Sequence, residues 1–269
     1  LLILFFFCWS GGSAQSLTDK LFFEHLTTED GLSHNYVQSI YQDKDGFIWL
    51  GSDNGLNRYD GQHIDIFSTN TQPTLGGNKI RRIVQDRNKN LWILHENGLD
   101  KMKYSTQQVK SFLYDKKQSK RWVGIGIDRK ENLIAYTEKK IFRYDIEKDT
   151  LLSLQDAPQE YRYSAYIHTG GKNYVGTRQH GVIVYDEDWQ LLEHIYPRSI
   201  EKGPLTDGLI NVLQTDSEGC IWSIIVGICI NKYNPQTREV KTYRLSSTSV
   251  INKEIRDIIE LDKDYMLIG

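Results

Sequence analysis

Several charged side chains stand where this sequence departs from its own internal repeats. Arg81-Arg82 replaces Gln38-Ser39, and His95-Glu96 replaces Ser52-Asp53. A third segment of this kind is Arg178-Gln179-His180. Guanidinium, imidazole and carboxylate groups that lie close together can hydrogen-bond sugar hydroxyls or a uronate carboxylate. The candidate ligand-binding residues are therefore Arg81, Arg82, His95, Glu96, Arg178 and His180, with ordinary surface charges as the alternative interpretation.

The segment Asp43-Lys44-Asp45-Gly46 resembles a calcium loop only superficially. A loop of the EF type needs further oxygen ligands and a bidentate Glu at a fixed offset. The equivalent turns that begin at Asp86 and Asp216 also replace the second Asp by another residue. We predict no metal and no cofactor, and expect Asp43, Asp86 and Asp216 to hold the backbone amides of their own turns.

The sequence contains no recognisable catalytic constellation. Aligned on Trp49, the Asp-box of sialidases (S-x-D-x-G-x-T-W) would place its Asp at Lys44 and its Thr at Ile48, so the match fails. A glycosidase needs a pair of carboxylates, and the acidic residues here sit mostly at repeat-equivalent turns. The His and Ser residues form no nucleophile elbow or triad signature. We predict that this chain is not an enzyme.

A repeat that begins at Val37 supplies the elements that must position the candidate residues. Alternating apolar and polar residues, broken by turns at residues 43–46, 53–55 and 60–61, predict four short strands in residues 37–67. Repeats begin near residues 37, 80, 122, 163, 210 and 255. A period of roughly 40–50 residues with four strands per unit is typical of a β-propeller. One strand position carries large apolar residues, which predicts packing between neighbouring blades: Trp49, Trp92, Trp222, Ile134, Tyr174 and Leu267.

The predicted fold is an all-β propeller of four-stranded blades, with about five full blades and a truncated sixth in an incomplete seven-bladed ring. Residues 1–14 resemble a secretory signal peptide whose start is truncated, because a short apolar run precedes small residues that end at Ala14. Residues 15–36 hold a lone strand (21–25) and a lead-in, and residues 37–269 form the propeller, which we expect to be truncated at its C-terminus. The connectors between blades and the hairpins near Asn54, Asn97 and His180 should share one face, where binding commonly occurs.

The bulk composition restricts the partners. The chain has 269 residues and a formal net charge of −2, which gives no reason to expect contact with nucleic acid. Cys220 and Cys229 lie on neighbouring strands of the fifth repeat. A disulfide is one interpretation, but counting the hairpin inward from Ile221 and Tyr233 places the two residues out of register, which favours two separate buried thiols.

Three segments carry a resemblance to a known family. They are residues 31–37 (GLSHNYV), 42–51 (QDKDGFIWLG) and 54–61 (NGLNRYDG). Together with the similar segment after Ile80, they resemble the two-component-regulator propeller repeat in the periplasmic sensor regions of hybrid two-component histidine kinases of Bacteroidetes. The resemblance implies two seven-bladed propellers, a β-sandwich and one membrane helix, followed by kinase, receiver and DNA-binding domains. The phosphorylation sites of that family have no counterpart in this chain.

The same resemblance implies a function. It suggests the periplasmic, ligand-sensing portion of such a protein, which detects oligosaccharides and so controls glycan-utilisation genes. The implied partners are an oligosaccharide, a second propeller and a homodimer mate, with the membrane reached only through a region C-terminal to this chain. Two alternatives stay open: a structural or dimerisation propeller without ligand contact, and a propeller-type carbohydrate-active enzyme.

Overall fold

The computed structural model describes residues 25–113, 121–198, 203–244, 255, 257–262 and 265–268. The predicted signal peptide (1–14) and, apart from His25, the predicted strand over 21–25 lie outside the described residues. The first described element is the 3-10 helix η2 (Thr28–Asp30). The Thr27 side chain caps this helix and Gly31, in the left-handed region at φ 104°, ends it. It leads the chain into the first strand.

Twenty of the strands in the described residues form five antiparallel sheets of four, each in sequence order from the inside outwards. Blade 1 comprises β1 (Val37–Gln42), β2 (Ile48–Ser52), β3 (Gly55–Tyr59) and β4 (Ile64–Phe67). Blade 2 comprises β5 (Ile80–Gln85), β6 (Leu91–His95), β7 (Gly98–Met102) and β8 (Val109–Leu113). Blade 3 comprises β9 (Trp122–Ile127), β10 (Leu133–Thr137), β11 (Lys140–Asp145) and β12 (Thr150–Asp156). Blade 4 comprises β13 (Tyr163–Thr169), β14 (Lys172–Thr177), β15 (Val182–Tyr185) and β16 (Leu191–Ile195). Blade 5 comprises β17 (Ile210–Thr215), β18 (Ile221–Ile225), β19 (Cys229–Tyr233) and β20 (Val240–Arg244).

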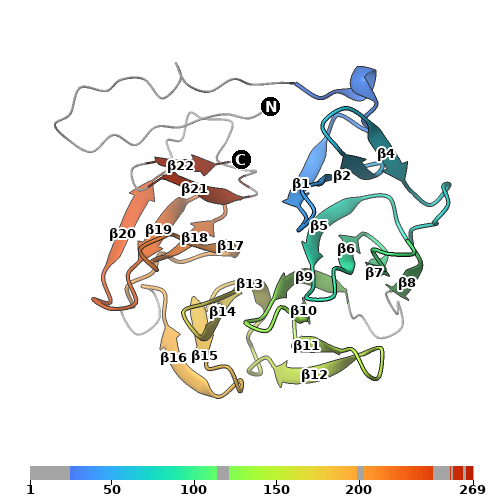
Figure 1. Ribbon diagram of the computed structural model, residues 1–269. Helices are drawn as coiled ribbons and strands as arrows, with labels where there is room; N and C mark the ends of the chain where they lie inside the picture. Colours follow the sequence, from blue (N-terminus) through green and yellow to red (C-terminus); the bar gives the residue numbers. More distant parts are fainter. Residues whose placement is uncertain are drawn as a thin grey trace, which may run out of the picture.

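The blades follow one another around a common axis, with the first strand of each blade innermost (Figure 1). The prediction of an all-β propeller of four-stranded blades is therefore confirmed for five blades. After blade 5 comes a two-stranded sheet of β21 (Ile258–Asp262) and β22 (Tyr265–Ile268). A truncated sixth blade in a seven-bladed ring stays a prediction.

The core lies between blades, because alternate residues of a strand point to opposite faces of its sheet. On β5, Ile83 packs with Trp49 of blade 1, whereas the next residue, Val84, packs with Tyr144 of blade 3. At the position of Trp49, the residues Trp92, Ile134 and Tyr174 likewise pack between blades, and Trp222 packs between blade 5 and β21. Burying such side chains contributes roughly 1.5–3 kcal/mol each, so each blade depends on its neighbours for its stability.

The turns between the first two strands of blades 1, 2 and 5 share one hydrogen-bond pattern. The Asp86 carboxylate accepts the backbone amides of Asn88 and Asn90 at 2.9 and 3.0 Å and the Trp92 indole Nε1–H at 2.8 Å. The same three kinds of bond occur at Asp43 and Asp216, where the indoles of Trp49 and Trp222 also donate at 2.8 Å. One carboxylate thus ties the turn to the tryptophan that packs between blades.

The connectors that enter blades 1, 2 and 5 are fastened in an equivalent way. Each has a buried leucine: Leu32, Leu75 and Leu205. Beside it, a polar side chain of the third strand accepts a hydrogen bond from the connector. Asn57 accepts the Ser33 amide at 2.8 Å, Asp100 the Gly76 amide at 2.7 Å and Asn231 the Thr206 hydroxyl at 3.2 Å. These contacts hold the connectors on one face of the propeller.

Candidate functional site

The face that carries the inter-blade connectors also carries the hairpins between the second and third strands; we call it the connector face. Backbone bonds join the two kinds of loop. The Arg178 amide donates to the Arg162 carbonyl at 3.0 Å, the Val226 amide to the Leu209 carbonyl at 3.1 Å, and the Gly55 amide to the Asn78 carbonyl of the next connector at 2.7 Å. Side chains from neighbouring blades therefore meet on this face.

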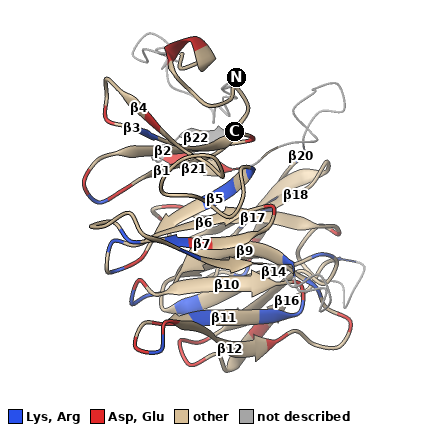
Figure 2. Ribbon diagram, turned by 90° about the vertical axis from the view of Figure 1, so that its right-hand side faces the viewer, with Lys and Arg blue, Asp and Glu red and all other residues tan. Residues whose placement is uncertain are grey.

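A pocket of about 710 Å³ opens on the connector face where blades 2, 3 and 4 adjoin. We call it the basic pocket, because six of its lining side chains are cationic and only one is a carboxylate. Figure 2 shows Lys and Arg in blue, including segments of β5 and β11. The lining residues are Arg81, Arg121, Trp122, Val123, Thr137, Glu138, Lys139, Lys140, Phe142, Arg162 and Arg178.

Two of the six candidate ligand-binding residues line the basic pocket: Arg81 from the start of β5 and Arg178 from the β14–β15 hairpin. Arg82 follows Arg81 on the same strand, where the pairing register with β6 shifts between Ile80 and Arg82, and it is not among the lining residues. His180 lies on the Arg178 hairpin, where its ring stacks on Tyr161 at a centroid distance of 4.0 Å. The structure thus brings together part of the predicted set.

His95 and Glu96 serve the connector into blade 2. The His95 side chain is fully buried, with Nε2 3.3 Å from Asp100 Oδ1, and its Nδ1 accepts the Asn97 amide at 3.2 Å. The Glu96 carboxylate accepts the amides of Asn78 and Lys79 at 3.1 and 2.8 Å. Both side chains hold backbone in place, so the geometry does not support them as ligand contacts.

Sequence reasoning missed most of the pocket. Trp122 and Phe142 form an aromatic wall, with ring centroids 5.2 Å apart in an edge-to-face arrangement. Arg121, Arg162, Glu138, Lys139 and Lys140 supply charge. A signal was present, because Arg121 and Arg162 each stand one residue before an innermost strand and Arg81 is the second residue of another. It becomes visible only when the strand starts of three adjacent blades are superposed.

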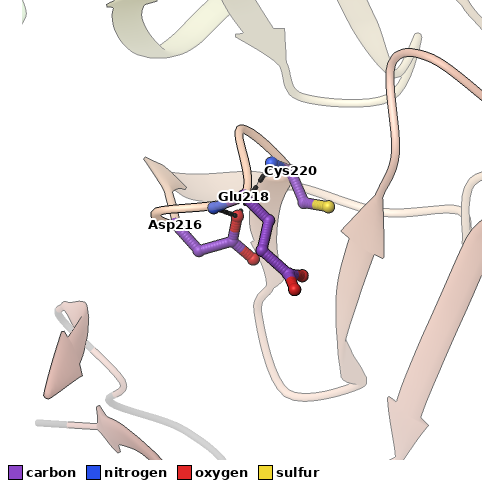
Figure 3. A group of neighbouring side chains, drawn as sticks. All are labelled: Asp216, Glu218 and Cys220. Atoms are coloured by element: carbon purple, nitrogen blue, oxygen red, sulfur yellow. Dashed lines mark hydrogen bonds between the residues drawn. The ribbon is translucent and has the colours of Figure 1, made fainter. Parts of the chain in front are cut away.

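A second cluster, Asp216, Glu218 and Cys220, lies at the first turn of blade 5, with ligand-type atoms within 4.8 Å of one another (Figure 3). The Asp216 carboxylate already accepts two turn amides and the Trp222 indole. The Lys232 ammonium lies 2.9 Å from Asp216 and 3.0 Å from Glu218. Because Lys232 supplies a cation to both carboxylates, we interpret this cluster as a turn anchor and not as a metal site.

Because the Asp216 carboxylate anchors this turn, we expect the stability of the folded protein to depend on pH. Burial acts to raise the pKa of Asp216, but bonds from the Lys232 ammonium, the Trp222 indole and the Cys220 amide outweigh it and hold this pKa below its ordinary value. A carboxyl whose pKa is lowered by folding stabilises the folded state at pH values above its unfolded pKa of about 3.9. This stabilisation is lost as the pH falls through the pKa of the folded state. Asp216→Asn should therefore cost about 1–3 kcal/mol at pH 6 and distinctly less at pH 3. Urea unfolding at both pH values measures this difference, and an equal cost at both would contradict it.

Cys220 and Cys229 are separate buried thiols. Ile221 pairs with Tyr233, and Cys229 is opposite Ile225, which is the register expected from the sequence. Burial raises the pKa of both thiols. Both groups are therefore poor nucleophiles.

Comparisons with known proteins agree with this architecture. The family described as Two component regulator propeller matches residues 31–54 and 74–97. This chain carries two-component-regulator propeller repeats. The matched segments include the connector anchors Leu32 and Leu75 and the hairpin residues His95 and Glu96. Apart from Arg81 they contain none of the residues that line the basic pocket.

The proteins to which this chain is similar include one named as a histidine kinase. The chain is 37% identical over 60 residues to histidine kinase P4 of Formosa agariphila, across 22% of this chain and 4% of that protein. In structure it is similar to the extracellular domain of the hybrid two component system BT3049 from B. thetaiotaomicron, with a TM-score of 0.70 and 22% identity over 91% of this chain and 34% of that one. The virginiamycin B lyase of Staphylococcus aureus has a TM-score of 0.61 at 11% identity, over 79% of this chain and 71% of that one.

The chain thus spans about a third of the BT3049 domain and a small part of the kinase. Identities of this order to the solved structures show a shared fold. Within the described residues, the structure has no helix that is both long and apolar enough to span a bilayer.

Proposed function

We propose that this chain is the extracytoplasmic ligand-sensing portion of a hybrid two-component signal-transduction protein, and that it detects oligosaccharides at the basic pocket. The observation that carries the proposal is the composition of the pocket. It combines hydrogen-bond donors from three blades with the Trp122–Phe142 wall, and sugars are bound by such a mixture of polar groups and aromatic faces. The repeats supply the signalling context.

The proposed mechanism follows from the location of the pocket. A ligand that contacts Arg81, Trp122 and Arg178 at once would join blades 2, 3 and 4. It would stabilise one relative arrangement of those blades, or of the propeller and its partner domain, by its differential affinity for that arrangement. Transmission to a kinase, and from it to glycan-utilisation genes, would run through regions outside this chain.

A thermal-shift screen of the chain against plant, host and microbial oligosaccharides tests the proposal. A ligand that binds only the native state raises the melting temperature, because occupancy at 100 times Kd stabilises by about 2.7 kcal/mol. We expect at least one oligosaccharide to raise it reproducibly while its monosaccharides do not. If no oligosaccharide in a broad panel raises the melting temperature, the alternative of a structural or dimerisation propeller, which we call the scaffold function, is favoured instead.

That alternative, a structural or dimerisation propeller, has an observation of its own. The β18–β19 hairpin of blade 5 has an apolar tip on the connector face, with Val226 38% and Ile228 46% exposed. Apolar side chains exposed side by side are typical of protein contacts. An enzyme is the least supported function, because the lining of the basic pocket includes one carboxylate, Glu138, and glycoside hydrolysis generally uses two.

A further inference from the structure

The charges of the basic pocket are only partly balanced. Lys140 pairs with Asp156 at 2.9 Å. Arg162 and Arg178 share a single carboxylate, Glu138, at 2.8 and 2.5 Å. Lys139 donates to the carbonyl oxygens of Gln159 and Tyr161 at 2.9 and 2.8 Å, and neutral carbonyls do not cancel its charge. The lining therefore keeps an excess of positive charge.

Glu138 stands at the tip of the β10–β11 hairpin of blade 3 and faces blade 4. Its carbonyl accepts the Tyr163 amide at 2.8 Å, while its carboxylate holds Nη1 of Arg162 and Nη2 of Arg178. These contacts use one nitrogen of each guanidinium, and both side chains are about half exposed (54% and 51%). Each guanidinium has five N–H donors in a planar fork, so further donors of both arginines can reach a ligand.

The strength of the ion pairs with Glu138 determines what Arg162 and Arg178 can bind. An ion pair between side chains this exposed stabilises by only about 0–1 kcal/mol, so Glu138 does not saturate the arginines. Carboxylate and sulfate groups match the arginine fork and form charge-assisted hydrogen bonds that are roughly twice as strong as neutral ones. A neutral sugar hydroxyl would gain little from the excess charge.

We propose that the basic pocket selects oligosaccharides that carry an anionic group, a carboxylate or a sulfate, and that Glu138 determines how strong this selection is. The inference rests on the proposed function and names its ligand class. Glu138 keeps Arg162 and Arg178 side by side, and its negative charge opposes the incoming anion. The Trp122–Phe142 wall accommodates the apolar face of the sugar ring.

The test compares matched ligands on matched variants of the full chain. The probes are trigalacturonate and its neutral trimethyl ester, titrated by calorimetry at low and moderate NaCl, with inorganic sulfate as competitor. Glu138→Gln keeps the size of the side chain and one acceptor oxygen but removes its charge. Glu131→Gln is the control, because Glu131 lies in the same blade at the opposite end of β9 and also forms an exposed ion pair, with Lys44 at 2.5 Å.

We expect trigalacturonate to bind at least about tenfold more tightly than its ester, which corresponds to about 1.4 kcal/mol, with an affinity that falls as salt rises. Glu138→Gln should raise the affinity for trigalacturonate by about threefold to tenfold, because one nearby like charge is removed, and leave the ester unchanged. Glu131→Gln should change neither affinity. Displacement of trigalacturonate by sulfate would show that the site accepts a sulfate group as well as a carboxylate.

Three outcomes would overturn the inference. Equal affinities for the acid and its ester would refute charge selection while leaving oligosaccharide sensing intact. Weaker binding of trigalacturonate by Glu138→Gln would show that Glu138 acts only by holding the arginines. If neither probe nor any oligosaccharide in the broader screen binds, the proposed function and this inference fail together.

Discussion

Replacing Arg81 and Arg178 together by alanine should weaken oligosaccharide binding by roughly a hundredfold. Hydrogen bonds to charged groups contribute about 1.5–3 kcal/mol each, and every 1.4 kcal/mol is a factor of ten in affinity. The two residues enter the pocket from different blades but contact the same ligand, so we expect a combined loss at the lower end of the sum of the two contributions. Calorimetric titration with the best oligosaccharide from the screen measures the effect.

The control for this variant comes from the same part of the chain. Arg87→Ala with Arg129→Ala removes two positive charges as well, but Arg87 lies in the turn at the far end of β5 and Arg129 in the turn at the far end of β9. The control pair should bind within about threefold of wild type, since distant surface charges act weakly through solvent. Equal losses in both double variants would mean that net charge, and not the pocket, governs binding. Unchanged binding in both would place the ligand elsewhere and favour the scaffold function.

Replacing Trp92 by alanine should lower the free energy of unfolding by about 3–5 kcal/mol, the range for truncating a large buried aromatic side chain. Trp92 is fully buried between blades 2 and 3. Its ring lies edge-on to Tyr144 of blade 3 at a centroid distance of 4.6 Å, and its indole nitrogen binds Asp86 at 2.8 Å. The substitution removes inter-blade packing and the turn anchor at once. Urea unfolding followed by far-UV circular dichroism provides the measurement.

Trp92→Phe separates the two contributions. Phenylalanine keeps an aromatic ring between the blades and loses the bond to Asp86, whose Oδ2 still accepts the Asn90 amide group at 2.9 Å. We expect a cost of about 1–2 kcal/mol, that of one buried hydrogen bond to a charged group together with a small loss of volume. A cost below about 1 kcal/mol for Trp92→Ala would contradict the view that the tryptophan position holds adjacent blades together.

Much of the fold could be predicted because a propeller is a local repeat. Turn residues such as Asp43 and Gly46 and the alternation along each strand act within one blade, so each copy of the motif reports its own strands. The tryptophan position was recognisable for the same reason, since Trp49, Trp92 and Trp222 recur at one strand position. The hydrogen bond from the indole to the turn aspartate was not foreseen, because a strand pattern does not specify the direction of a ring nitrogen.

The candidate site was predictable only in part, because it is assembled from three blades. The sequence marked Arg81 and Arg178 as departures from the repeat, and both line the basic pocket. It marked His95 by the same reasoning, yet the structure buries His95 beside Asp100. A departure from a repeat reveals that a position has a special environment, and does not reveal whether that environment is solvent or another loop.

The sequence by itself determined the class of fold, the four-strand unit, the register of the Cys229 hairpin and the family of the repeats. These depend on neighbours in the chain, and local turn chemistry and strand alternation are sufficient for them. Only the tertiary structure decided that Arg121, Glu138 and Arg162 meet in one pocket with Trp122. Residues about 16 to 41 positions apart come together there because adjacent blades pack around a common axis, and that packing is a property of the whole ring.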